Sequence, residues 1–229
     1  MTASPAPVRI VFDIVTGKRL TTLNPHMVMR VSPEYDGLEV LYSNPAHTDK
    51  LFSTRILCWG LKRDGEIVAM IPWVNRVIPC THLKDPGKAM FEGYYNPATD
   101  TIFNEPPQHK TLELKAAAEY FRSTSEDPKV CIQEIPDTTG THAMLASADF
   151  SKLTLAEILS WRLLNDGTIH AMLVNERKVK TTPVLLGDAC LYAADASKKF
   201  RYFFQHHIAN QIKAEDPAAL AAVAMLLEN

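Results

Sequence analysis

Residues 55–74 carry the sequence RILCWGLKRDGEIVAMIPWV, which gives the clearest local prediction of structure in the chain. Two runs rich in β-branched and aromatic residues flank Asp64-Gly65, a dipeptide typical of the two-residue turn of a type I′ hairpin. A two-residue loop would place Trp59 opposite Met70, and both faces of the resulting hairpin would be apolar. The stretch therefore predicts a hairpin whose two faces are both covered by other parts of the protein.

Outward from this hairpin, the first hundred residues show strand patterns separated by turns. His26–Val31 and Leu38–Tyr42 precede the hairpin, and a second hairpin is expected from Ala89–Tyr95 to Thr101–Asn104. A helix is expected over Lys110–Ser123, because apolar residues recur there at helical spacing and the alanines favour helix. A short strand is then expected over Lys129–Ile135.

The last eighty residues show patterns that favour helices. Thr154–Leu164 begins with a capping box, in which Glu157 follows Thr154 by three residues, and Asp166-Gly167 is expected to end that helix. Ser197–Lys213 also has helical periodicity, and Asp216-Pro217 predicts the start of a last helix that reaches Leu227. Ile169–Val174 and Val184–Tyr192 fit either a strand or a short helix.

These patterns together predict an α+β fold. It would have an antiparallel β-rich N-terminal half with helices packed on it and a mainly helical C-terminal part. We divide the chain into a β-rich lobe with one helix, residues 1–140, and a mainly helical lobe, residues 141–229, with one continuous domain as the alternative. No internal repeat is evident at this level.

Charge and cysteine content limit the class of protein. The chain has 229 residues and a formal net charge of -2, with no strongly basic region, which disfavours dedicated binding of nucleic acid. The longest apolar run, Ala218–Leu227, is about half the length needed to span a bilayer, so no membrane span is expected. The cysteines form no C-x-x-C pair and are expected to be reduced, mostly buried thiols in a cytoplasmic protein; they are Cys58, Cys80, Cys131 and Cys190.

Sequence motifs of the common enzyme classes are absent. Neither G-x-G-x-x-G nor the P-loop pattern occurs, and neither G-x-S-x-G nor H-E-x-x-H is present. We therefore expect a protein that binds a small molecule or a protein partner, and leave open whether it is an enzyme. The last helix, Ala218–Leu227, is apolar almost all round, which predicts a homodimer with this helix at or near the interface.

Candidate ligand-binding residues fall in two places. Polar residues gather in and beside the second hairpin, where a rigid sheet can direct side chains into a cleft, and we select Glu92, Tyr94 and Asp100. Tyr202 and His206 would share one stripe of the predicted helix Ser197–Lys213 and could line a polar pocket. Residues 198–207 could alternatively form a basic, aromatic nucleic-acid surface, but packing in the core is the favoured interpretation.

Candidate metal ligands define the alternative function, a metal-dependent hydrolase or lyase. His109 and Glu113 are four residues apart and would share a helix face, with Glu105 supplied by the preceding loop, so the three could bind a divalent metal. His82 lies two residues from Cys80, on the same side if this stretch is extended. The competing interpretations are a solvated first helical turn and a buried thiol beside a surface histidine.

Overall fold

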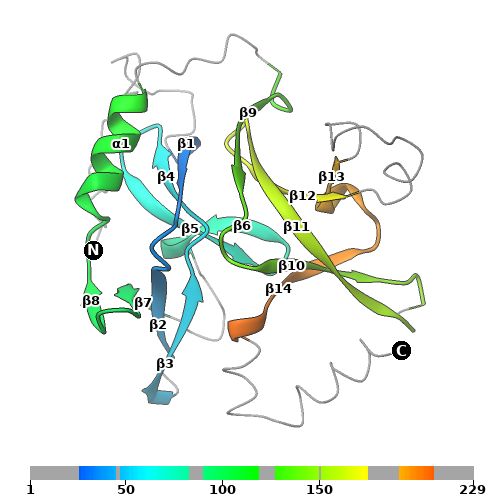
Figure 1. The fold of residues 1–229 in the computed structure, drawn as a ribbon, viewed down its shortest axis with the longest axis horizontal. Helices are drawn as coiled ribbons and strands as arrows, with labels where there is room; N and C mark the ends of the chain where they lie inside the picture. The colour runs from blue at the N-terminus through cyan, green and yellow to red at the C-terminus, as the bar shows by residue number, and fades with distance from the viewer. Residues whose placement is uncertain are drawn as a thin grey trace, which may run out of the picture.

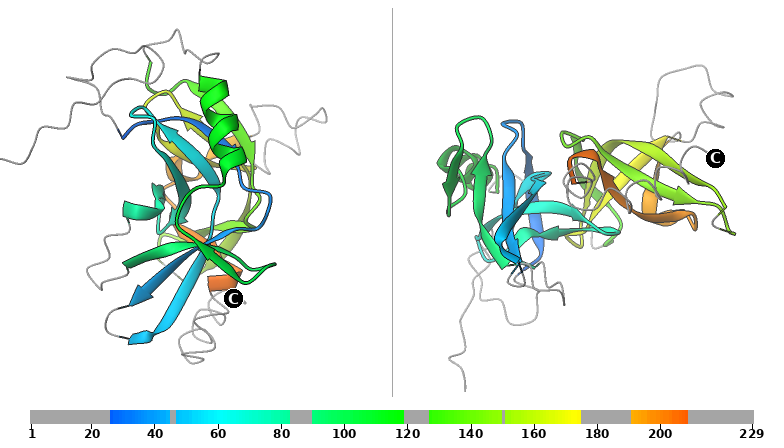
Figure 2. Two further views of the ribbon diagram at one scale, coloured as in Figure 1. Left: turned by 90° about the vertical axis from the view of Figure 1, so that its left-hand side faces the viewer. Right: turned by 90° about the horizontal axis from the view of Figure 1, so that it is seen from below.

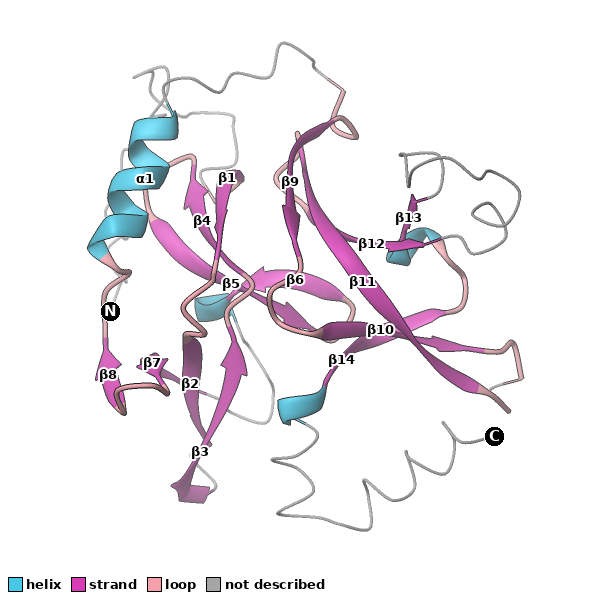
Figure 3. Cartoon of the chain, in the orientation of Figure 1, coloured by secondary structure: helices cyan, strands magenta, loops and turns pink. Residues whose placement is uncertain are grey.

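The computed structural model describes residues 26–44, 47–82, 90–118, 127–149, 151–174 and 191–208. Over these residues the protein is mainly antiparallel β-sheet in both halves of the chain (Figure 1). The expected α+β fold with a mainly helical C-terminal part is therefore wrong (Figure 3). Among the described residues, no helix is both long and apolar enough to cross a membrane.

The first half forms two four-stranded sheets, followed by the helix α1 (Gln108–Ala118). α1 packs on the first sheet through the buried Leu114, and this confirms the helix expected from residue 110 as far as residue 118. The first sheet has the order β1 (Val28–Pro33), β4 (Cys58–Lys62), β5 (Ile67–Trp73), β6 (Arg76–Pro79), and the second has the order β3 (His47–Arg55), β2 (Glu39–Asn44), β7 (Met90–Asn96), β8 (Thr101–Phe103).

The second half forms one six-stranded system of antiparallel strands. Its long strand β11 (Leu153–Leu164) pairs with three others, and one of them, β9 (Cys131–Pro136), lies off the main path of the sheet. The order along the main path is β13 (Leu191–Ala193), β12 (Ile169–Val174), β11, β10 (Thr141–Ala146), β14 (Phe200–Gln205). Short 3-10 turns, η1 (Cys80–His82) and η3 (Ala194–Ala196), follow β6 and β13.

The hairpin of β4 and β5 is confirmed, but its predicted register is wrong by one residue. Trp59 pairs with Ala69 rather than with Met70. The reason is a three-residue loop: the Gly65 N–H donates to the Lys62 carbonyl at 2.9 Å, and Gly65 has a φ of 83°. This is a type I turn closed by a left-handed glycine, which adds one residue to the loop and exchanges the faces of one strand. Both strands are nevertheless buried on both faces.

The helix expected over Thr154–Leu164 is instead the strand β11. Its pairing with β12 shifts register between Ile158 and Ser160, which marks a β-bulge at Leu159. In a regular strand, side chains alternate between the two faces of the sheet, and a bulge shifts this alternation by one residue. The buried Ile158 and Trp161 are therefore three residues apart, which is also the spacing expected on one face of a helix. The Asp166-Gly167 dipeptide does not end a helix; it forms the turn between β11 and β12, where the Gly167 N–H donates to the Leu164 carbonyl at 2.9 Å.

The helix expected over Ser197–Lys213 is wrong over most of its described part, where only residues 206–208 are helical. Phe200–Gln205 is the strand β14, consistent with the high β-propensity of its aromatic residues. The segment Ile169–Val174, which the sequence left ambiguous, is the strand β12. The rest of the expected helix beyond residue 208 and the last helix, Ala218–Leu227, lie outside the described residues, as does Cys190.

The two halves share an internal repeat that simple inspection of the sequence missed. Residues 56–70 and 158–172 align without a gap, and nine of the fifteen positions are identical. In the first copy these are Ile56, Leu57, Trp59, Leu61, Asp64, Gly65, Ile67, Ala69 and Met70, each 102 positions before its counterpart.

Strand pairing extends this repeat to the whole β architecture. Trp59 pairs with Ala69 as Trp161 pairs with Ala171, and Val40 pairs with Tyr94 as Ala143 pairs with Phe203. We call β1–β7 the first unit and β9–β14 the second unit, and they lie side by side in Figure 2. In chain order β1, β2, β5, β6, η1 and β7 correspond to β9, β10, β12, β13, η3 and β14, while β3 and β4 together correspond to β11. The division into lobes at residue 140 stays a prediction.

Each unit holds its central tryptophan in the same way. The indole N–H of Trp59 donates to Glu34 at 2.6 Å, and that of Trp161 donates to Asp137 at 2.9 Å. Both tryptophans are fully buried, so a polar N–H that found no acceptor would be costly. The repeat therefore includes a buried polar interaction as well as the apolar core.

Candidate ligand pocket

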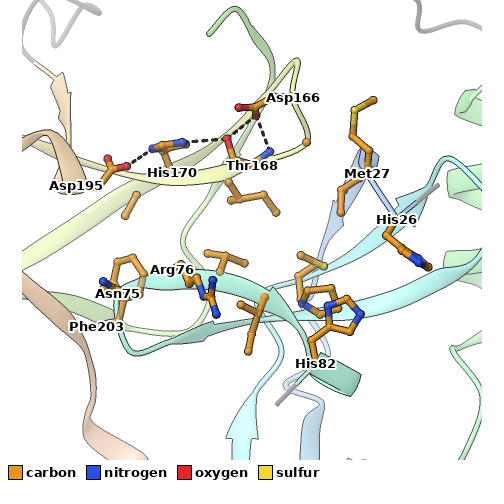
Figure 4. A pocket seen from close by; sticks show the side chains of 18 of the residues that line it. His26, Met27, Asn75, Arg76, His82, Asp166, Thr168, His170, Asp195 and Phe203 are labelled. Atoms are coloured by element: carbon orange, nitrogen blue, oxygen red, sulfur yellow. Dashed lines mark hydrogen bonds and ion pairs between the residues drawn. The ribbon is translucent and has the colours of Figure 1, made fainter. Parts of the chain in front are cut away.

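The site with the best-defined geometry is a pocket of about 530 Å³ between the two units (Figure 4). The turn of the β5–β6 hairpin and η1 supply one wall, and β12, the turn before it and η3 supply the other. Main-chain and side-chain hydrogen bonds fix the units beside it: the Phe203 N–H donates to the Val74 carbonyl at 2.6 Å, and the Gln205 amide donates to the Pro72 carbonyl at 3.3 Å. The pocket walls are thus held at a defined separation.

A chain of polar side chains runs along the second unit's wall. Asp195 lies 2.7 Å from Nδ1 of His170, whose Nε2 lies 3.0 Å from the Thr168 hydroxyl. That hydroxyl donates to Asp166 at 2.6 Å (Figure 4). Asp195 lies on η3, His170 lies on β12, and Asp166 lies in the turn between β11 and β12. Three adjacent elements therefore position these hydrogen-bonded side chains.

The order of these groups is similar to that of an acid, histidine and hydroxyl triad, but the protons are arranged differently. A nucleophilic hydroxyl must donate its proton to the histidine that activates it. Here the Thr168 hydroxyl donates its single proton to Asp166, so that proton is not directed at His170. The chain therefore holds the imidazole in place and does not activate Thr168 as a nucleophile.

The opposite wall is cationic at its rim and apolar at its base. Arg76, at the start of β6, is exposed beside Asn75, and His82 follows at the end of η1 (Figure 4). Met70 and Ile78 are buried and contribute apolar surface between these polar groups. The pocket thus offers an apolar surface with a few polar groups at defined positions, which is typical of small-molecule sites.

The internal repeat separates the structural residues of this wall from those specific to the site. Asp166 has the counterpart Asp64, and each accepts a backbone N–H two residues on, so this aspartate serves the turn in both units. Thr168 and His170 correspond instead to Glu66 and Val68 of the first unit. The chain through His170 is therefore a feature of the second unit that the shared fold does not require.

The structure does not bring the ligand candidates of the second hairpin together. Tyr94 is buried, with its ring centroid 4.9 Å from that of Trp59, and burial raises the pKa of its hydroxyl. Glu92 is exposed and accepts a hydrogen bond from Ser43, while Asp100 lies in the turn between β7 and β8 and accepts one from Tyr95 at 3.0 Å. Tyr94 thus serves the core, and the two carboxylates serve local surface contacts.

Tyr202 and His206 do not share a helical stripe, because Tyr202 lies on the strand β14. His206 is exposed after the end of that strand, with its ring centroid 5.2 Å from that of His142. Neither residue lines the pocket between the units. The helical stripe expected to bring these two residues together is therefore wrong, and their part in ligand binding stays a prediction.

The metal candidates receive no support from the described geometry. His109 lies 3.7 Å from Asp36, and Glu113 accepts a hydrogen bond from Ser32 at 3.0 Å, while Glu105 is exposed in the loop before α1. No group of three or more histidine, cysteine, aspartate or glutamate side chains in the described ranges could hold a metal ion.

His82, the fourth metal candidate, lines the pocket between the units, but it does not lie beside Cys80 on an extended stretch as predicted. Residues 80–82 form a 3-10 turn instead of an extended stretch. Cys80 is buried, where burial raises the pKa of its thiol to about 12, and His82 is exposed at the pocket.

The residues that sequence reasoning missed are Arg76, Thr168, His170 and Asp195. A usable signal was present, since the repeat aligns Asp64-Gly65 with Asp166-Gly167 and so predicts a second hairpin with His170 on its returning strand. Comparisons with protein-family models, with curated proteins and with solved structures found no match to this chain. The fold and the site therefore define it as a protein of two repeated antiparallel β units with a pocket between them.

Proposed function

We propose that this protein binds a small polar organic molecule in the pocket between its two units. The observation that carries the proposal is the chain of Asp195, His170 and Thr168, which one unit has and the other lacks, lining a pocket of about 530 Å³. That volume lies within the range of small-molecule sites, roughly 300–1,000 Å³. The proposal includes no catalytic step.

The two walls indicate the chemistry of the ligand. Arg76 offers a guanidinium that matches a carboxylate, and the carboxylates of Asp166 and Asp195 can only accept hydrogen bonds. A matching ligand carries a carboxylate at one end and amino or hydroxyl donors at the other, as amino acids and hydroxy acids do. The apolar surface of Met70 and Ile78 accommodates a short hydrocarbon part between these ends.

The test is a thermal-shift screen of the full chain against amino acids, hydroxy acids, simple carboxylates and neutral sugars. A ligand at one hundred times its dissociation constant adds about 2.7 kcal/mol to the free energy of unfolding. We expect stabilisation by a compound with both a carboxylate and a donor group, and its loss in Arg76→Met and in His170→Leu.

Lys198→Met is the matched control, because Lys198 is an exposed cation that does not line the pocket. Stabilisation that survives in Arg76→Met and His170→Leu would place the ligand elsewhere. No response to any compound would contradict the proposal and favour a protein partner.

The cellular location is part of the same proposal. Cys58 and Cys80 are buried free thiols. Reduced thiols of this kind are typical of a reducing compartment, and we place the protein in the cytoplasm.

A further inference from the structure

A second hollow, which we call the outer groove, lies on the second unit and has a volume of about 870 Å³. Strands β10–β13 carry most of its lining, and its half-buried apolar residues include Leu145, Leu155, Val174 and Tyr192. Lys199, in the segment before β14, adds an exposed cation. The outer groove thus combines apolar side chains with the polar residues Thr154, Glu157, Ser197 and Lys199, and it has a size that a short helix could cover.

The repeat shows how the equivalent surface of the first unit is used. Thr54 and Pro72 correspond by register to Ala156 and Val174, which line the outer groove. In the first unit these two positions contact the second unit: the Thr54 hydroxyl donates to Gln205 at 3.1 Å, and the Gln205 amide donates to the Pro72 carbonyl. In the first unit, this surface is therefore in contact with residues of the second unit.

The exposure of matched residues agrees with this difference. Leu57 is 0% exposed, whereas its counterpart Leu159, which lines the outer groove, is 37% exposed. Thr54 is likewise fully buried. Within the described part of the chain, Leu159 therefore lacks the cover that buries Leu57.

The C-terminal sequence supplies a segment with matching properties. All ten residues from Ala218 to Leu227 are apolar, and Asp216-Pro217 before them favours the start of a helix. A helix that is apolar all round requires burial on more than one side. Its five alanines and glycine-free sequence allow close approach to a sheet without loss of helix propensity.

The connection is long enough to reach the outer groove. Residues 206–208 form a helical turn after β14, and nine residues, the number from 209 to 217, span up to about 30 Å when fully extended. Strand β14 has six residues, or about 20 Å, so the chain can return along its full length to Lys199. A helix of ten residues is about 15 Å long.

We propose that residues 218–227 form a helix that docks into the outer groove of the same chain. The second unit then buries its exposed apolar residues under its own C-terminal segment. In the first unit, the equivalent surface is covered by the second unit. This placement gives the apolar helix a burial site without a homodimer. It is independent of ligand binding in the pocket between the units.

The test is disulfide trapping in the full chain with Cys131→Ser and Cys190→Ser, so that only buried native thiols remain in the described residues. Leu159→Cys or Lys199→Cys is combined with a single cysteine at Ala219, Ala222 or Ala224. Leu112→Cys on α1, a site 62% exposed and outside the outer groove, is the matched control anchor. Because Lys199 is exposed, its replacement keeps the test valid if Leu159→Cys does not fold.

We expect an intrachain disulfide to form about tenfold or more faster from the groove anchors than from Leu112→Cys, since docking brings the thiols within bonding distance. Equal rates from all anchors, or no disulfide at any tail position, would overturn the proposal. Disulfides between chains, detected by non-reducing mass analysis, would also overturn it and favour the homodimer expected from the sequence.

Discussion

At the scale of single residues, Val74 has the least favourable backbone conformation in the described protein. Its φ is 50°, a left-handed value that is an outlier for a β-branched residue. It occupies the two-residue turn between Trp73 and Arg76, which pair across the hairpin. The Val74 carbonyl accepts the Phe203 N–H at 2.6 Å, so this strained turn also joins the two units next to the pocket.

We expect Val74→Asn to raise the free energy of unfolding by about 1 kcal/mol, because asparagine adopts left-handed conformations at lower cost. The Val74 side chain is 57% exposed, so its replacement loses little packing. Urea denaturation of both proteins measures the change. Leu112→Asn, on an exposed part of α1, controls for the removal of a surface apolar group, and an equal effect there would contradict the strain argument.

At the scale of elements, the carboxylates that hold the tryptophans differ in burial. Glu34 is 2% exposed and accepts both the Trp59 indole N–H and the Asp36 backbone N–H at 2.6 Å. Asp137 is half-buried and accepts the N–H of Trp161 together with the backbone N–H groups of the following turn. An amide would present one NH₂ group to a donor in either site.

We expect Glu34→Gln to lower the free energy of unfolding by about 3 kcal/mol and Asp137→Asn by about 1 kcal/mol, since water can reach the second site. Chemical denaturation followed by tryptophan fluorescence gives both values in one experiment. Equal losses would show that burial does not set the cost of the unpaired N–H.

The elements also show which parts of the fold the sequence could predict. The β4–β5 hairpin, the β7–β8 hairpin and the start of α1 follow from local turn chemistry and periodicity. β11 could not be recognised by periodicity alone, because the bulge at Leu159 gives a strand the spacing of a helix. The pocket could not be predicted locally either, since β6 and β12 come together only when the units pack.

At the scale of the whole molecule, the turn before β12 packs directly on the start of β1. A Cβ atom on Gly167 would lie 2.5 Å from the Met27 side chain and 2.9 Å from the Val28 backbone nitrogen. The Gln133 amide adds a second link, because it donates to the Val31 carbonyl at 2.6 Å and accepts the Val31 N–H at 2.9 Å. Close backbone approach and paired hydrogen bonds thus fix one unit against the other.

Gly167→Ala tests whether this contact holds the units together. Gly167 and Gly140 both have left-handed backbones, with φ of 85° and 66°, but a Cβ on Gly140 meets nothing within 4 Å. We expect Gly140→Ala to cost about 1 kcal/mol of unfolding free energy from strain alone, and Gly167→Ala about 3 kcal/mol because backbone atoms must also separate. Denaturant titration measures both, and equal losses would contradict a tight junction. Because the pocket spans this junction, Gly167→Ala is also expected to reduce ligand stabilisation, whereas Gly140→Ala is not.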